Sequence, residues 1–224
     1  MKGVFGDCQF TCFPDCQLAL PPESAKNLKY LVAGLLSLAL TGCVSFTPTG
    51  PIGLPSQAMA QSVPVGALLK DVEVSDPQLN ETQRRNISNV LTTQIAQHID
   101  RGEYFERMIS FPAKLDERDV ELRFNFTSLK GKRTPHPGYF PGALLTLTMW
   151  IWVNGPIYVD KYDLRGELTI DDAAGKQVAH VEKVLVLNQN TGLWDADYFN
   201  ASGSQQLTQL VEQLLKDGTQ QLAH

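Results

Sequence analysis

Residues 119–127 read DVELRFNFT, and this stretch decides the class of fold. Apolar side chains occupy every second position, with polar ones between them, at Val120, Leu122, Phe124 and Phe126. Because successive side chains of a strand point to opposite faces, the pattern predicts a strand with one buried and one solvent-facing side. The chain therefore contains a sheet whose apolar face needs a covering element.

Two segments predict amphipathic helices that could provide this cover. The first should start at Asp76-Pro77, because Asp caps free amides and Pro suits the first helical position, and should end at Gly102. The second is expected over residues 204–222. In the first helix the apolar residues recur at helical spacing, at Ile87, Val90, Leu91, Ile95 and Ile99.

Further strands are expected on both sides of this central stretch. They fall near residues 67–74, at 104–109, and in a hairpin of 157–170 with 177–187. Residues 130–138 are predicted to form a loop. The resulting class is α+β, with two layers: an antiparallel or mixed sheet carrying two amphipathic helices on one face.

The N-terminal part has the pattern of an export signal. Lys26 and Lys29 precede an apolar run over residues 31–40, which is too short to span a bilayer but fits a secretory signal. The run leads to Leu40-Thr41-Gly42-Cys43, which resembles the lipobox of bacterial lipoproteins. This resemblance implies that Cys43 carries lipid, such as palmitate, and becomes the first residue of the mature chain. The alternative is a short buried helix that ends in Gly-Cys.

The resemblance also implies a location in the cell. Val44, rather than Asp, follows the cysteine, which by the sorting pattern of such lipoproteins indicates the outer membrane with the protein facing the periplasm. Residues 1–42 would then be leader and signal peptide. Residues 1–25 are expected either to be discarded with the signal or not to be translated.

The segment after Cys43 predicts a spacer. Residues 44–66 contain no charged side chain and several prolines, a composition typical of a linker. We therefore expect a lipid-anchored tether over residues 43–66 and a single α+β domain over residues 67–224.

Signals for catalysis are weak. The formal net charge of −5 disfavours nucleic acid as a partner. There is no G-x-S-x-G motif, and the pair Asp195 and Asp197 fits a polar turn better than a calcium loop. The histidines, scattered without metal-ligand spacing, are His98, His136, His180 and His224. We expect no catalytic residue, no metal and no cofactor.

One uncharged, aromatic stretch stands out as a candidate contact surface. No Asp, Glu, Lys or Arg occurs from Thr134 to Val159, and residues 144–153 would be apolar on both faces if extended. They could form a central strand covered on both sides. Alternatively they could meet a membrane or a partner, since Trp and Tyr suit both interfaces. The candidate contact residues are Tyr139, Phe140, Trp150, Trp152 and Tyr158.

The function that these patterns favour is binding. We expect a non-catalytic, lipid-anchored periplasmic binding or assembly protein of the cell envelope, attached to the membrane and presenting the face 139–158 to a partner protein or to the membrane. The alternatives are an envelope hydrolase acting on cell-wall material and a lipid carrier whose apolar segment lines a cavity.

Overall fold

The computed structural model contains a mixed seven-stranded sheet and helices that pack against it. It describes residues 43–55, 62–110, 114–146, 149–195, 197–199 and 201–222. The leader, the lipobox residues before Cys43 and residues 56–61 of the expected tether lie outside the described residues. The class α+β is confirmed.

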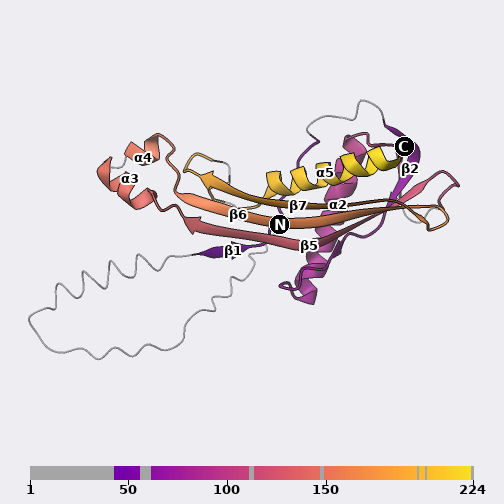
Figure 1. Ribbon diagram of the computed structural model, residues 1–224, viewed down its shortest axis with the longest axis horizontal. Coiled ribbons are helices and arrows are strands. Elements are labelled where there is room, and N and C mark those ends of the chain that lie inside the picture. Colours follow the sequence, from indigo (N-terminus) through magenta and orange to yellow (C-terminus); the bar gives the residue numbers. More distant parts are fainter. Residues whose placement is uncertain are drawn as a thin grey trace, which may run out of the picture. The chain divides into compact units, whose positions relative to one another are not determined.

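Three long antiparallel strands dominate the sheet (Figure 1). They are β5 (Val120–Pro135), β6 (Tyr158–Asp172) and β7 (Gln177–Thr191). The strand expected from DVELRFNFT is confirmed, but β5 continues through the predicted loop 130–138 as far as Pro135. It does so because β6 pairs with it without interruption from Ser128 to Pro135.

The other edge of β5 is shared by three short strands. Two of them run parallel to it, β2 (Val63–Leu69) and β3 (Glu73–Val74), and β1 (Val44–Phe46) runs antiparallel near its C-terminal end. Strand β4 (Phe105–Ile109) extends the sheet beyond β2, again in parallel. The sheet is therefore mixed.

The two amphipathic helices are α2 (Glu81–Arg101) and α5 (Ser204–Leu222). Both place buried side chains in one core cluster with the apolar residues of β5 and β6. Our expected start for α2 at Asp76-Pro77 is wrong by one turn. Asn80 caps the helix in a capping box, whereas buried Asp76 accepts a hydrogen bond from the backbone N–H of Leu129.

Residues 44–54 differ from the expected free tether. Val44–Phe46 pairs with β5, and the edge of the Phe46 ring packs on Tyr162. The backbone N–H of Ile52 donates to Gln94 of α2, and that of Gly53 donates to Thr208 of α5, at 3.0 and 2.7 Å. A stretch without charges thus lies on the domain, because its backbone groups find partners on both helices.

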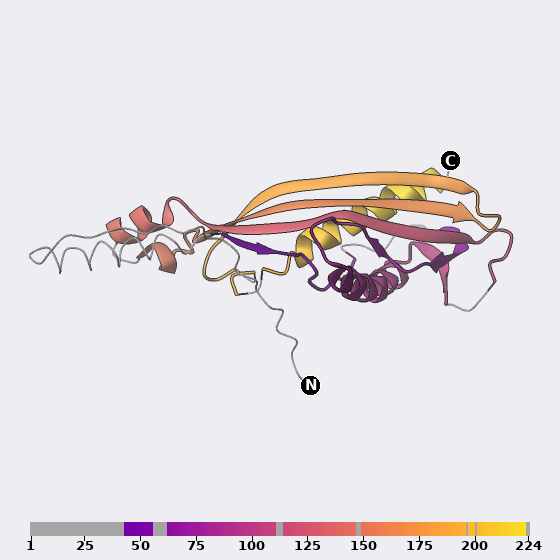
Figure 2. The same ribbon diagram turned by 90° about the horizontal axis from the view of Figure 1, so that it is seen from below.

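Residues 144–153 do not form the central strand that was considered. The chain leaves β5 at Pro135 and returns in β6 at Tyr158, and between them it forms α3 (Tyr139–Leu145) and α4 (Met149–Trp152). Figure 2 shows both short helices beyond one end of the long strands. Among the described residues, no helix is long and apolar enough to cross a membrane.

Candidate functional site

The apolar tip consists of the described residues 139–146 and 149–155, which include α3 and α4. Its large side chains face solvent: Leu145 is 83% exposed and Trp152 is 71% exposed. Of the 14 exposed large apolar side chains among the described residues, nine lie in the tip, in residues 193–199 or next to Cys43. They are Val44, Phe140, Leu144, Leu145, Met149, Trp152, Val153, Trp194 and Phe199.

Trp150 holds the tip together from within. Its indole lies against Gly142 and Gly155, so closely that a Cβ atom on either glycine would come within 2.6 Å of the ring. The indole N–H donates to the carbonyl of Pro156 at 3.2 Å. The hydroxyl of Thr146 accepts from the backbone N–H of Trp150 and donates to the carbonyl of Gly142, which joins the two helices.

A second aromatic segment lies beside the tip. We call residues 193–195 and 197–199 the aromatic loop. The indole N–H of Trp194 donates to the carbonyl of Ile151 at 3.2 Å, and its ring centroid lies 6.4 Å from that of Trp152. Asn154 donates to Asp195 and accepts from the backbone N–H of Trp194, both at 3.0 Å. Two segments 40 residues apart are thereby fixed to each other.

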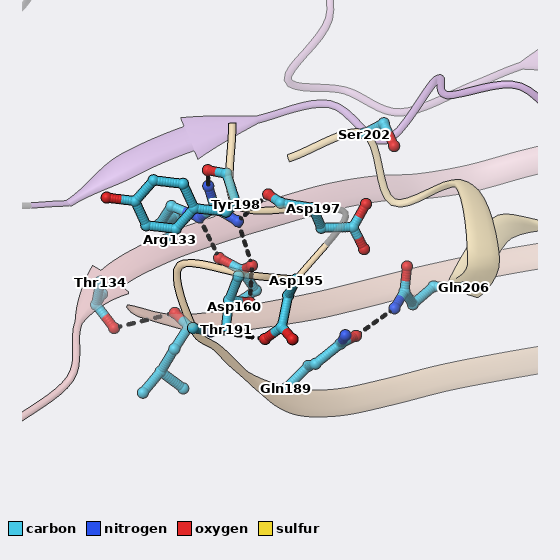
Figure 3. Close-up of polar contacts among 12 residues, drawn as sticks. Arg133, Thr134, Asp160, Gln189, Thr191, Asp195, Asp197, Tyr198, Ser202 and Gln206 are labelled. Carbon is cyan, nitrogen blue, oxygen red and sulfur yellow. Dashed lines mark hydrogen bonds and ion pairs between the residues drawn. The ribbon is translucent and has the colours of Figure 1, made fainter. Parts of the chain in front are cut away.

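Beneath the tip, a buried ion pair ties the aromatic loop to the sheet (Figure 3). Arg133 on β5 donates two hydrogen bonds of 2.6 Å to Asp160 on β6. The same guanidinium donates to the carbonyls of Asp197 and Tyr198, each at 2.7 Å. The hydroxyl of Thr191 donates to Asp160 at 2.8 Å, which adds the end of β7 to the group.

The electrostatics of this group follow from its burial. The hydrogen bonds from Arg133 to Asp160 raise the pKa of the Arg133 guanidinium above its ordinary value. Burial, followed by the negative charge of Asp160, raises the pKa of Tyr162 to about 12. Burial, together with the charges of Asp160 and Asp195, raises the pKa of the Asp197 carboxyl. Arg133 therefore stays cationic and Tyr162 stays neutral at physiological pH.

The candidate lipidation residue lies at this same end of the sheet. Cys43 is exposed and directly precedes β1. Val44 pairs with Arg133, two residues before the end of β5. A shallow groove of about 450 Å³ beside it is lined in part by Val44, Phe46 and Phe199.

The structure brings together some of the residues that we selected from the sequence. Tyr139 and Phe140 form an edge-on pair in α3, with centroids 5.5 Å apart, and Trp150 and Trp152 belong to α4. Tyr158 lies apart from them, below the tip. There the Cζ atom of Arg133 lies over its ring, 5.1 Å from the ring centroid. The centroids of the Tyr158 and Tyr198 rings are 5.7 Å apart.

Sequence reasoning missed the aromatic loop and the ion pair. The loop carries Trp194, Tyr198 and Phe199 within six residues, and this local density of aromatic residues was the available signal. Arg133 and Asp160 gave no such signal, because each looks like an ordinary charged residue until the hairpin pairs them.

The geometry of the tip bears on the alternative functions. A lipid carrier requires apolar side chains around a cavity, whereas Leu144, Leu145 and Met149 face solvent. Among the acidic groups below the tip, Asp160 and Asp195 are both engaged in hydrogen bonds that hold backbone or side chains in place. The absence of an enzymatic activity stays a prediction.

Comparisons with known proteins leave the family open. No family model matches the chain, and no curated protein matches it. A neuraminyllactose-binding hemagglutinin homolog from Helicobacter pylori aligns with a TM-score of 0.38 and 6% identity, over 74% of this chain and 90% of the other. A minor lipoprotein from Acinetobacter baumannii gives 0.35 and 14%, over 72% and 92%.

A third solved structure, a lipoprotein from Neisseria meningitidis, aligns with a TM-score of 0.32 and 8% identity, over 66% of this chain and 99% of the other. Two of these three structural neighbours are thus described as bacterial lipoproteins. The TM-scores and identities are low throughout, so these likenesses assign neither a family nor an activity to this chain.

Proposed function

We propose that this protein is a lipid-anchored, non-catalytic binding or assembly protein of the cell envelope. The observation that carries the proposal is the apolar tip, an exposed aromatic and aliphatic surface at the end of the sheet where β1 begins. Exposed apolar surface of this kind is unfavourable in water, and soluble proteins that retain it generally use it for contact.

The proposed anchor is Cys43, acylated after removal of residues 1–42, with the protein on the periplasmic face of the outer membrane. Its position supports this role, because the residue is exposed and precedes the first strand. Stable anchoring requires more than one acyl chain, which a fully acylated N-terminal cysteine provides. Strand β1 then replaces the expected tether as the link between anchor and domain.

We also propose that α2 and α5 share one face of the sheet and leave the other face to solvent, as two layers. The single core cluster supports this arrangement. So does β7, in which Ala179 and Val181 are buried while His180 and Glu182, which alternate with them, are exposed. The binding surface is then the tip rather than either sheet face.

Two measurements test the proposal. Mass spectrometry of the mature N-terminus should find an acylated Cys43, and an unmodified Cys43 would refute the anchor. A photo-crosslinking side chain at position 152, introduced into cells, should capture an envelope component. The matched control is position 178 on β7, also an exposed apolar residue, which should capture nothing specific. Equal capture at both positions would contradict the proposal that the tip is the binding surface.

A further inference from the structure

The tip has the composition of a surface that meets lipid. Its large exposed side chains are aliphatic or aromatic, and no Asp, Glu, Lys or Arg occurs from Thr134 to Val159. The helices of the tip are too short to cross a bilayer, with seven residues in α3 and four in α4. Short apolar elements with Trp and Phe at their surface suit the boundary between headgroups and acyl chains.

The chain path brings the proposed lipid attachment to the tip. Val44 pairs with Arg133, and β5 ends at Pro135 before α3 begins at Tyr139. At about 3.3 Å per residue, Pro135 lies only about 7 Å farther along the strand than the partner of Val44. Acyl chains on Cys43 would therefore draw this end of the sheet, and the tip with it, to the membrane surface.

Basic side chains lie at the level where the sheet meets the tip. Lys132 on β5 and Lys161 on β6 are directly opposite each other, and both are exposed. Neither makes an ion pair with any residue that the structure describes. Two like charges side by side repel each other, and an anionic headgroup would relieve that repulsion.

We propose that the apolar tip inserts into the leaflet that holds the acyl chains of Cys43, with Lys132 and Lys161 against anionic phospholipid headgroups. This inference rests on the proposed function and names its partner as the lipid surface. The aromatic loop enters the same interface, because Trp194 donates a hydrogen bond to the tip and Phe199 lines the same groove as Val44. The domain is thus held at three points: the acyl anchor, the tip and the basic pair.

The tryptophans make insertion directly measurable. The chain has three, Trp150, Trp152 and Trp194, and all belong to the tip or the aromatic loop. The full-length lipoprotein is purified from membranes and placed in vesicles of phosphatidylethanolamine and phosphatidylglycerol with brominated acyl chains, since bromine quenches indole emission at short range. We expect emission to fall about twofold or more against unbrominated vesicles, most strongly for bromines near the headgroup.

Amino-acid substitutions test which part of the protein causes the quenching. Leu145→Asp should restore most of the emission, because a carboxylate resists insertion, whereas Val178→Asp at the far end of β7 should behave as the unmodified protein. Phosphatidylcholine in place of phosphatidylglycerol should weaken quenching. The double change Lys132→Gln with Lys161→Gln should abolish that difference between lipids.

The mass of the Cys43 peptide, measured on the same sample, separates the two proposals. Unquenched emission from a protein whose Cys43 is acylated would overturn the insertion alone and would favour a protein partner for the tip. An unacylated Cys43 would overturn both proposals. Quenching that Leu145→Asp and Val178→Asp reduce equally would also contradict insertion through the tip.

Discussion

Arg133 is the residue that ties the aromatic loop to the sheet. Its side chain is 10% exposed and that of Asp160 is 1% exposed, so both charged groups are largely shielded from water. Such a pair contributes little net stability, but removing one partner leaves the other charge buried and unpaired. The four hydrogen bonds of Arg133 therefore specify where the loop lies more than they stabilise the whole fold.

Replacing Arg133 by methionine should be strongly destabilising. We expect the free energy of unfolding to fall by about 3 kcal/mol, because Asp160 would keep only the hydrogen bond from Thr191. Chemical denaturation measures this change. The matched control is Arg165→Met on β6, whose side chain is 50% exposed and pairs with an Asp163 that is 36% exposed, so the change should cost less than about 1 kcal/mol. Equal losses in both variants would contradict a buried pair.

Asp197 predicts a pH-dependent effect. Its pKa is raised, so in the folded state the ionised form is disfavoured relative to the unfolded chain. Folding stability is then lost as pH rises from the ordinary aspartate value, about 3.9, through the higher folded value. Asp197→Asn should therefore stabilise the protein at pH 7.

Thermal melting of both proteins at several pH values tests this linkage. The advantage of Asp197→Asn should shrink as the pH falls through the raised folded pKa of Asp197 toward the ordinary aspartate pKa, and should be smallest below that value. The backbone carbonyl of residue 197, which accepts from Arg133, is unaffected by the change. An advantage that is independent of pH, or a destabilised variant at pH 7, would show that the carboxylate is not under electrostatic strain.

At the scale of elements, α3 and α4 keep their arrangement through one aromatic ring between two glycines. An alanine methyl at position 155 would approach the Trp150 indole at about 2.4 Å, well inside contact distance. Gly155→Ala should therefore displace the ring and change the near-ultraviolet circular dichroism of tryptophan. The far-ultraviolet spectrum should change little, because the tip contributes no residue to the core cluster.

Gly53→Ala is the control for that experiment. A methyl there meets Thr208 only at ordinary contact distances of 3.4 Å or more, so the near-ultraviolet spectrum should be unchanged. A Gly155→Ala spectrum identical to that of the unmodified protein would mean that the Trp150 ring is not fixed between these glycines.

The elements that were predictable are those with one buried face. The alternation in DVELRFNFT and the leucine stripe of residues 204–222 reflect a single apolar side, so the period is readable. Residues 144–153 have no polar side, and an apolar run without a period fits strand and helix equally. The tip was therefore recognised as a candidate surface, while its secondary structure was left open.

Other failures had local and long-range causes. The expected helix start at Asp76-Pro77 was wrong because the Asp76 carboxylate accepts a long-range hydrogen bond from the backbone N–H of Leu129, and Asn80 caps the helix instead. The attachment of the aromatic loop to the tip depends on contacts such as Trp194 to Ile151, which are 43 residues apart. No local pattern encodes such a pairing.

At the scale of the whole molecule, the account depends on two features sharing one end of the sheet. Strand β1 positions the residue after Cys43 opposite Arg133, and the tip begins four residues after β5 ends. At the opposite end, the β6–β7 turn around Gly175 is polar and carries Asp172 and Lys176. Among the described residues, the exposed large apolar side chains are therefore concentrated at the tip end of the strands, and Val178 is an isolated one near the β6–β7 turn.

Hydrogen–deuterium exchange on the protein purified from membranes tests this claim most directly, with the vesicle-bound protein compared with a Cys43→Ser protein in solution. We predict that vesicles slow exchange in residues 139–155 and 193–199, where the apolar tip and aromatic loop meet lipid. Residues 172–182, at the β6–β7 turn, should exchange at the same rate in both samples. Protection of the β6–β7 turn, or equal exchange of the tip in both samples, would contradict the account.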